Sequence, residues 1–300
     1  MTMDLHALEQ FLVVARLEHL SRAAGELRVA QPSLSRTIAR LESEVGAPLF
    51  DRTGRLRLNE SGRLFRDHVE RSLGELAAGR RAAAEAARGG VGGVRLASET
   101  FLTITGPLAA YKDAHPDVDV ELHQMPAADM HRSLRAREVD LCVASQPILG
   151  DGLDSIRLYD EPVWLAAPPD HRLAERASVS VKELREEPFV IARPGHWQRR
   201  LLDRLFAGHN LTPRIVCEGD EPAALAGLVS VGIGLTLIPA VARGADVNTP
   251  CVWIGIDDPA CRRTLTLHRA TDSQLSTAAR LMHTTLATWL WNTTGSQQQR

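Results

Sequence analysis

The stretch SRAAGELRVAQPSLSRTIARLESEVG, residues 21–46, constrains the fold more than any other part of the chain. It contains two short amphipathic segments separated only by residues 28–31, which is too short for anything but a turn. Pro32 suits the first position of a new helix, because that position needs no backbone N–H donor. The second segment repeats apolar residues at spacings of four, three and four, which is the helical period: Leu34, Ile38, Leu41 and Val45. Two helices joined by so tight a turn cross steeply, as in a helix-turn-helix.

The polar residues of the second helix fall outside its apolar stripe and gather near its N-terminus. A recognition helix meets DNA base edges with its first turns. Gln can pair with adenine, Arg with guanine, and Ser with a base or a phosphate. The alternative is the solvated face of an ordinary amphipathic helix. The candidate DNA-contacting residues of this region are Gln31, Pro32, Ser33, Ser35, Arg36 and Arg40, together with Ser21, which is placed to cap the preceding helix.

Both flanks extend this unit. Upstream, an apolar face at residues 5, 8, 12 and 15 predicts a preceding helix. Downstream, GAPLFDRTGRLRLNESG reads as a β-hairpin in which Gly54 supplies the turn. The tip of the hairpin carries Arg52, Thr53 and Arg55, which could reach phosphates or a minor groove. Residues 1–59 are therefore predicted to form a winged helix-turn-helix domain.

The run from FLVVARLEHLSRAAGELRVAQPSLSRTIARLESEVG to APLFDRTGR closely resembles the LysR-type transcriptional regulators, with Gln-Pro-Ser-Leu-Ser, Leu-Glu and Pro-Leu-Phe in their places. The resemblance continues more loosely over the remaining chain. It implies a regulator that binds a double-stranded DNA operator, responds to a small-molecule effector and contacts RNA polymerase. It also implies a homodimer or a dimer of dimers.

The composition supports this interpretation only through the distribution of charged residues along the chain. The 300 residues carry a net charge of −2, which by itself does not indicate a nucleic-acid binder. Residues 21–66, however, hold nine Arg and no Lys against five acidic residues, so a local basic patch could supply DNA affinity. The absence of a membrane-length apolar run or a cleavable leader leads us to expect a cytoplasmic protein with no membrane partner.

Metal, redox and catalytic chemistry have little support in the sequence. The four cysteines form no CxxC pair, and the 11 histidines are scattered, so we expect no metal site. Cys251 and Cys261 flank an apparent hairpin, and a redox role for them is the minor alternative, since some relatives sense peroxide through a cysteine pair. The chain has no GxSxG, P-loop, GxGxxG at a strand–helix junction, or HExxH motif. We therefore expect no enzyme and no cofactor.

Residues 60–88 predict one long helix with a narrow apolar stripe, which suits a partner helix. The resemblance implies a linker helix that holds two copies together, and paired half-sites on DNA require such a dimer. The alternative is packing against the chain's own domains. A hinge follows at GGVGG, residues 89–93. The residues assigned to dimerisation are Phe65, Val69, Leu73 and Leu76.

Beyond the hinge, strands and helices alternate, which predicts an α/β fold with a parallel sheet. We expect a first unit of strands at 94–98, 118–124 and 140–145, with helices at 105–115 and 130–137. A second unit follows, in which we expect a strand at 162–168 and a helix near 180–186. The chain then returns to the first unit through a strand at 263–270 and a helix over 275–290. This order resembles the two-lobed type 2 periplasmic-binding-protein fold. The expected effector-binding domain is 94–300, with lobe I at about 94–160 and 266–300 and lobe II at about 161–265.

Ligands of open α/β sheets bind beyond the carboxyl ends of the strands, near helix N-termini. Several predicted strand ends are polar there, and relatives place effector contacts at these loops, often with a hydroxyl near Ser98 and Thr100 meeting a carboxylate. Alternatively, Ser98 and Asp220 cap their helices. Helix N-termini and Arg193 favour an anion, whereas acidic residues favour a cation or a hydroxylated compound; we expect a small organic acid with an apolar part. The candidate effector residues are Ser98, Thr100, Phe101, Ser145, Gln146, Arg193, His196, Trp197, Glu218, Gly219 and Asp220.

Two other functions fit parts of the sequence. A solute-binding protein would share the two-lobed fold, but the missing signal peptide and the N-terminal unit of residues 1–88 argue against it. A nucleoid-type DNA binder with a vestigial effector domain would bind DNA without sequence preference. The function we expect is a sequence-specific transcriptional regulator controlled by a small molecule bound between two α/β lobes.

Overall fold

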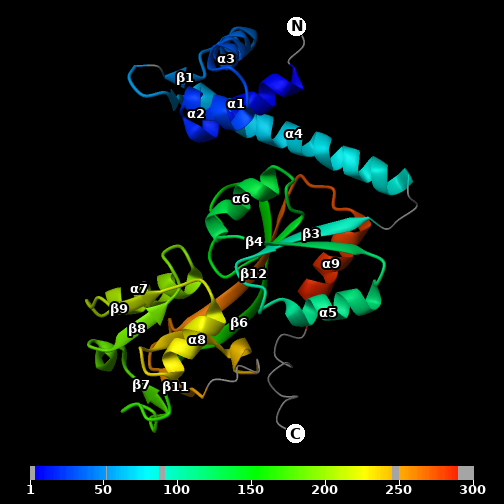
Figure 1. Ribbon diagram of the computed structural model, residues 1–300. Helices are drawn as coiled ribbons and strands as arrows, with labels where there is room; N and C mark the ends of the chain where they lie inside the picture. The colour runs from blue at the N-terminus through cyan, green and yellow to red at the C-terminus, as the bar shows by residue number, and fades with distance from the viewer. Residues whose placement is uncertain (1–3, 52, 88–91, 245–249, 290–300) are drawn as a thin grey trace. The chain divides into compact units, whose positions relative to one another are not determined.

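The computed structural model describes residues 4–51, 53–87, 92–244 and 250–289 (Figure 1). The chain divides into two compact units. The first contains residues 1–88 with 135–138, and the second contains residues 89–134 and 139–300. Arg52 and most of the predicted hinge lie outside the described residues.

Three helices and a small hairpin form the winged helix-turn-helix unit that the sequence predicts. Its core is built around Phe11, whose ring lies 5.7 Å from that of Phe50 on the hairpin. One expectation is wrong, because α2 begins at Leu20 and is capped by the ring of His19, so Ser21 is not its cap. The elements are α1 (Leu5–Leu17), α2 (Leu20–Leu27), α3 (Gln31–Val45), β1 (Phe50–Asp51) and β2 (Arg57–Leu58).

The long helix α4 (Glu60–Ala87) is present, but three of its four predicted dimer residues face inward. Val69 is 3% exposed and belongs to the core of the first domain, and Phe65 and Leu73 pack against that core. Residues four apart lie on one helix face, and here that face covers α1 and the hairpin. The assignment of Val69 to a dimer interface is therefore corrected in favour of packing within the chain. For the half-buried Phe65 and Leu73, and for Leu76, which is 51% exposed, the dimer assignment stays a prediction.

Lobe I has the predicted βαβαβ order. Its three parallel strands lie in the order β4-β3-β5, with β3 in the centre. Helix α6 starts three residues before the predicted position and ends two before it. The elements are β3 (Gly93–Ser98), α5 (Thr105–Ala114), β4 (Asp119–Gln124), α6 (Ala127–Arg135), β5 (Leu141–Ala144) and, after the return from lobe II, α9 (Thr277–Thr288).

Two long antiparallel strands run through both lobes (Figure 1). Strand β6 (Leu153–Ala167) begins nine residues before the strand that the sequence predicts, and β12 (Arg262–Ala270) pairs with it along its length. Their register shifts between Leu265 and Thr266, where β12 passes from lobe II to lobe I and starts to pair with β5 as well. The two strands thus carry the covalent connection between the lobes.

Lobe II packs α7 and a short helical turn against strands around an apolar core. The helix expected at 180–186 is a single 3-10 turn, η1. The hairpin expected between Cys251 and Cys261 is wrong, because β11 pairs with β6 and β7 and not with β12. The elements are β7 (Ser178–Val179), η1 (Val181–Leu184), β8 (Pro188–Ile191), α7 (Trp197–Ala207), β9 (Arg214–Glu218), α8 (Pro222–Ser230), β10 (Thr236–Pro239), η2 (Ala240–Gly244) and β11 (Val252–Ile256).

The cysteines are all free thiols. Burial raises the pKa of Cys261 to about 12, and it raises the pKa of Cys142 and Cys251 as well. Thiolates are the reactive form, so these environments favour the interpretation of the cysteines as small apolar residues.

Candidate functional site

The N-terminal end of α3 presents a polar face to solvent. The preceding residue, Ala30, offers no side-chain cap to the first turn, so polar side chains and backbone N–H groups share this end. Ser35 is half-buried, and Arg36 donates from Nε to the carbonyl of Pro32 at 3.3 Å, which holds its side chain along the helix. The other predicted residues are exposed: Ser21, Gln31, Pro32, Ser33, Arg36 and Arg40.

The hairpin brings a second polar segment into the same domain. The Asp51 carboxylate accepts from the backbone N–H of Thr53 at 3.1 Å and from its hydroxyl at 2.7 Å. Gly54 has φ +96°, which an L-residue rarely adopts, so the turn requires glycine there. Arg55 follows on the exposed side of the turn.

Two carboxylates fix the base of this hairpin to the helices. Glu42 of α3 accepts from the backbone N–H groups of Leu49 at 2.8 Å and Phe50 at 3.2 Å. Glu18, at the end of α1, accepts from the N–H of Leu58 at 2.9 Å. Since Glu42 lies on the recognition helix itself, it links the position of the hairpin to that of the helix. Sequence reasoning missed this role, although the Leu-Glu pair was part of the family resemblance.

Glu42→Ala is expected to weaken both the domain and its DNA binding. Two N–H donors would lose a charged acceptor, which costs about 1–3 kcal/mol when the donors are buried, and the hairpin would lose its fixed position. Urea unfolding followed by circular dichroism and fluorescence anisotropy with operator DNA would measure the two effects. Glu44→Ala is the matched control, because residue 44 points to another side of the same helix.

Glu42→Gln should restore part of the affinity, since an amide oxygen still accepts. If Glu42 acts by positioning the hairpin, Arg55→Ala should reduce DNA affinity less in the Glu42→Ala background than in the unmodified protein. Full additivity of the two substitutions would contradict the positioning role.

In lobe I, the hydroxyl of Ser98 is already hydrogen-bonded within its own loop. It donates to the carbonyl of Thr100 at 2.8 Å and accepts from the N–H of Thr100 at 3.4 Å, and Ser98 is buried. It does not cap α5, which starts at Thr105 after Ile104. Phe101 is half-buried against the lobe I core. The Ser98–Thr100 turn thus shapes the loop, and Thr100 is its half-exposed member.

Glu99, between these residues, is the centre of the hydrogen bonds at the lobe junction. Its carboxylate accepts from the N–H of Ser145 and from the side-chain amide of Gln146. The same amide donates to the carbonyl of Gly195 in lobe II at 2.9 Å, so Gln146 bridges the lobes. Burial raises the pKa of Glu99, although these hydrogen bonds and the charge of Arg263 act in the opposite direction.

The lobe II loops carry the remaining predicted effector residues. His196 caps α7, and burial lowers its pKa while the charge of Asp220 acts in the opposite direction. Arg193 and Asp220 form an exposed ion pair at 3.1 Å. Asp220 does not cap α8, whose N-cap position is Glu221. Glu218 pairs with Arg199, outside this group.

Sequence reasoning missed Arg263 and Glu161, the buried ion pair of the two long strands. Arg263 donates to Glu161 through Nε at 2.8 Å and to the hydroxyl of Thr103 through Nη2 at 3.2 Å. Its guanidinium carbon also lies 4.6 Å from the centre of the Trp197 ring in lobe II. The available signal was a charged residue inside each apolar strand pattern, DEPVWLAAP and CRRTLTL.

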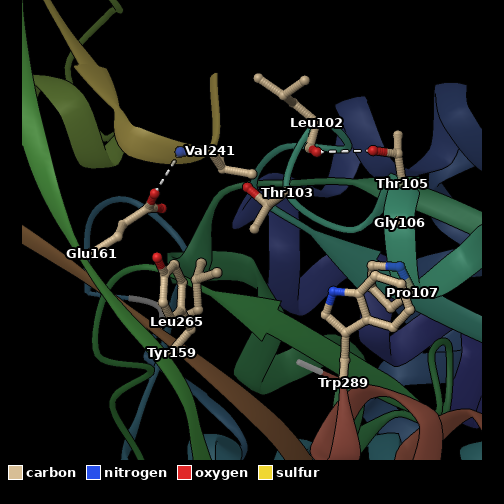
Figure 2. A pocket seen from close by; sticks show the side chains of 10 residues that line it. All are labelled: Leu102, Thr103, Thr105, Gly106, Pro107, Tyr159, Glu161, Val241, Leu265 and Trp289. Carbon is tan, nitrogen blue, oxygen red and sulfur yellow. Dashed lines mark hydrogen bonds between the residues drawn. The ribbon is translucent and has the colours of Figure 1, made fainter. Parts of the chain in front are cut away.

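A small pocket, partly open to solvent, lies beside the long strands and is lined in part by Tyr159 and Glu161 of β6 and Leu265 of β12 (Figure 2). In it the Glu161 carboxylate already accepts from the N–H of Val241 at 2.8 Å. None of the predicted effector residues lines it. Its lining residues are Leu102, Thr103, Thr105, Gly106, Pro107, Tyr159, Glu161, Val241, Leu265 and Trp289.

The structure therefore joins all four loops that carry the predicted effector residues. Gln146 connects the loops at 98–101 and 145–146 to the loop at 193–197, and Arg193 connects that loop to Asp220. Gly219 donates its N–H to Ile191 at 3.1 Å, at the end of the neighbouring strand. Across the described ranges, no three His, Cys, Asp or Glu residues cluster as metal ligands, and no helix is long and apolar enough to cross a membrane.

Two protein families match the chain. The bacterial regulatory helix-turn-helix proteins of the lysR family match residues 5–63, and the LysR substrate binding domain matches residues 87–291. A relative from Bacillus subtilis, the uncharacterized HTH-type transcriptional regulator YybE, is 32% identical over 88% of this chain and 91% of its own. AlsR, an HTH-type transcriptional regulator of the same organism, is 30% identical over 80% of this chain and 82% of its own.

Solved structures show the same fold. CbnR, a LysR family transcriptional regulator, matches with a TM-score of 0.62 at 20% identity over 95% of this chain and 99% of its own. Full-length CbnR in complex with its target DNA matches with a TM-score of 0.61 at 19% identity, over 95% of this chain and 99% of its own.

Proposed function

Because the chain belongs to the LysR family of DNA-binding transcriptional regulators, we propose that its α3 face and hairpin read a double-stranded operator under the control of a small effector. The family consists of regulators with an effector-binding domain and not of enzymes. The observation that carries the DNA part is the exposed polar end of α3, with Gln31, Ser33 and Arg36 clear of the apolar core. Glu42 holds the hairpin against α3, and this position supports a second contact, between the hairpin and the DNA backbone.

We further propose that the protein acts in the cytoplasm as a homo-oligomer and contacts RNA polymerase there. Operators of helix-turn-helix proteins are read by paired domains, which requires at least a dimer. The exposed Leu64 and Leu76 on α4 support an interface along this helix, since they are large apolar side chains in solvent.

The effector is proposed to be a small organic acid bound between the lobes. The cleft is supported by the two contacts that cross it, Gln146 to Gly195 and Arg263 to Thr103. A ligand that binds one closure of the lobes better than another shifts the population by its difference in affinity. The Ser98 hydroxyl, which is already hydrogen-bonded, is a weaker candidate for the ligand carboxylate than the sequence suggested.

Arg36→Ala and Arg55→Ala should weaken DNA binding in different ways. If Arg36 makes a bidentate base contact, its loss should cost about 1–3 kcal/mol on the operator and less on unrelated DNA. Arg55 on the hairpin should contact phosphate, so its loss should weaken all sequences similarly and reduce the salt dependence. Anisotropy titrations at several salt concentrations would measure both.

Full operator affinity in both variants would reject this face as the DNA interface. Binding that is salt-dependent but equal for every sequence in the unmodified protein would favour the nucleoid-type alternative.

A further inference from the structure

Two buried polar atoms at the lobe junction have no hydrogen-bond partner: Gln146 Oε1 and Arg263 Nη1. Their side chains are well buried, with residue exposures of 7% and 3%. Buried polar groups in proteins are almost always paired, because an unpaired one costs its full desolvation. These two atoms therefore point to a group that the chain itself does not supply.

The two atoms lie in one neighbourhood. Gln146 donates to the carbonyl of Gly195, and Arg263 lies over the ring of Trp197 two residues further along. Gln146 also donates to the Glu99 carboxylate, and the positive charge of Arg263 acts to lower the pKa of the same group. A small molecule bound between Gln146 and Arg263 would meet both atoms.

The chemistry of each atom is fixed. The amide nitrogen of Gln146 donates to two oxygens, those of Glu99 and Gly195, so its Oε1 can only accept. A guanidinium nitrogen can only donate. The missing group must bring a hydrogen-bond donor to Gln146 and an acceptor to Arg263.

The charges narrow the ligand further. Two buried carboxylates, Glu99 and Glu161, are influenced by the charge of Arg263, and Glu161 makes the direct contact with it. Glu99 is left with neutral donors only. His196 adds no full charge at neutral pH, because burial lowers its pKa. A positive charge beside Glu99 would therefore be favourable.

We propose that the effector is a small zwitterionic amino acid. Its ammonium group would donate to Gln146 Oε1 beside Glu99, and its carboxylate would accept from Arg263 Nη1. The inference rests on the proposed function, since it specifies the effector of the same cleft. It moves the anion contact from the exposed Arg193, which is paired with Asp220, to the buried Arg263.

Related molecules satisfy only part of this arrangement. A plain carboxylic acid adds negative charge beside two carboxylates and brings no donor to Gln146. An amine without a carboxyl group leaves Arg263 Nη1 unpaired. A hydroxy acid supplies a donor but no positive charge.

The test is titration calorimetry and thermal shift on the full chain with the twenty standard amino acids. Each amino acid that binds is then compared with its deaminated acid and its decarboxylated amine. We expect at least one amino acid to bind, and both of its analogues to bind at least ten-fold more weakly. Equal binding of the deaminated acid, or no binding by any amino acid, would overturn the inference.

Variants identify the site. Glu99→Gln removes the negative charge at nearly constant size, so it should weaken the amino acid at least ten-fold and strengthen the deaminated acid, reversing the preference. Gln146→Met should also weaken the amino acid ten-fold. Because it removes one donor from the buried Glu99 carboxylate, the melting temperature without ligand checks that the variant is folded. Arg262→Gln is the matched control, because neighbouring residues on a strand face opposite sides and Arg262 pairs with the exposed side of Asp160. Unchanged amino-acid affinity in both Glu99→Gln and Gln146→Met would overturn the assigned site.

A wider set of metabolites separates this inference from the proposed function. If a compound that is not an amino acid binds the unmodified protein but not Gln146→Met, the position of the effector site between the lobes is supported and the amino-acid class is wrong. If a bound compound retains its affinity in Gln146→Met, the cleft itself is wrong, whereas the DNA-binding face is tested separately by the Arg36 and Arg55 variants.

Discussion

Glu161→Ala is expected to destabilise the effector-binding domain by about 3–5 kcal/mol, because it leaves a buried guanidinium without its carboxylate. Glu161 is fully buried, and Arg263 has almost no exposed surface either. The same substitution removes the acceptor of the Val241 N–H, at 2.8 Å. A charge that was neutralised by its neighbour would then remain desolvated between the lobes.

Tryptophan fluorescence during urea unfolding measures this effect selectively, since all five tryptophans lie beyond residue 160, in the effector-binding domain. Asp160→Ala is the matched control. Asp160 pairs with Arg262 at 2.6 Å near the surface, where an ion pair contributes only about 0–1 kcal/mol. The double variant Glu161→Leu with Arg263→Met should recover much of the lost stability, because it removes both charges together. Equal small losses for Glu161→Ala and Asp160→Ala would contradict the role of the buried pair.

The parts of the fold that the sequence predicts well are those with local causes. Helix α3 follows from the period of Leu34, Ile38 and Leu41 and from Pro32 at its start. The turn of the hairpin follows from a glycine that must adopt positive φ. The polar residues at the end of a predicted strand also indicated that Ser145 and Gln146 lie in a loop at the cleft. In the structure, Gln146 of this loop donates to the carbonyl of Gly195.

The parts that the sequence misses depend on distant partners. Arg263 and Glu161 are 102 residues apart, and no local pattern joins them. The first half of β6 has polar, partly exposed residues, so only its pairing with β12 makes it a strand. The apolar stripe of α4 was visible in the sequence, but such a stripe does not show which surface it packs against. In the structure, three of its four residues pack into or against the core formed with α1 and the hairpin.

This correction of α4 leads to a second large effect. Val69→Asp places a charge in the core of the DNA-binding domain, in the same buried cluster as Phe11 and Leu49. Burying an unpaired carboxylate costs several kcal/mol, so we expect a loss of more than about 3 kcal/mol in the stability of this domain. Circular dichroism should show early loss of helix, whereas tryptophan fluorescence, which reports only on the other domain, should change little.

Leu76→Asp should act in the opposite manner. Its side chain is half exposed, and an exposed substitution changes stability by only about 0.5 kcal/mol. If α4 pairs with a second copy through this side, the charge should shift the protein toward monomers in sedimentation and reduce operator affinity while the fold stays intact. A stable, folded Val69→Asp protein would contradict the core position of Val69 and favour its original assignment to the dimer interface. An intact oligomer in Leu76→Asp would instead exclude this side of α4, and DNA binding by paired domains would then require contacts elsewhere in the chain.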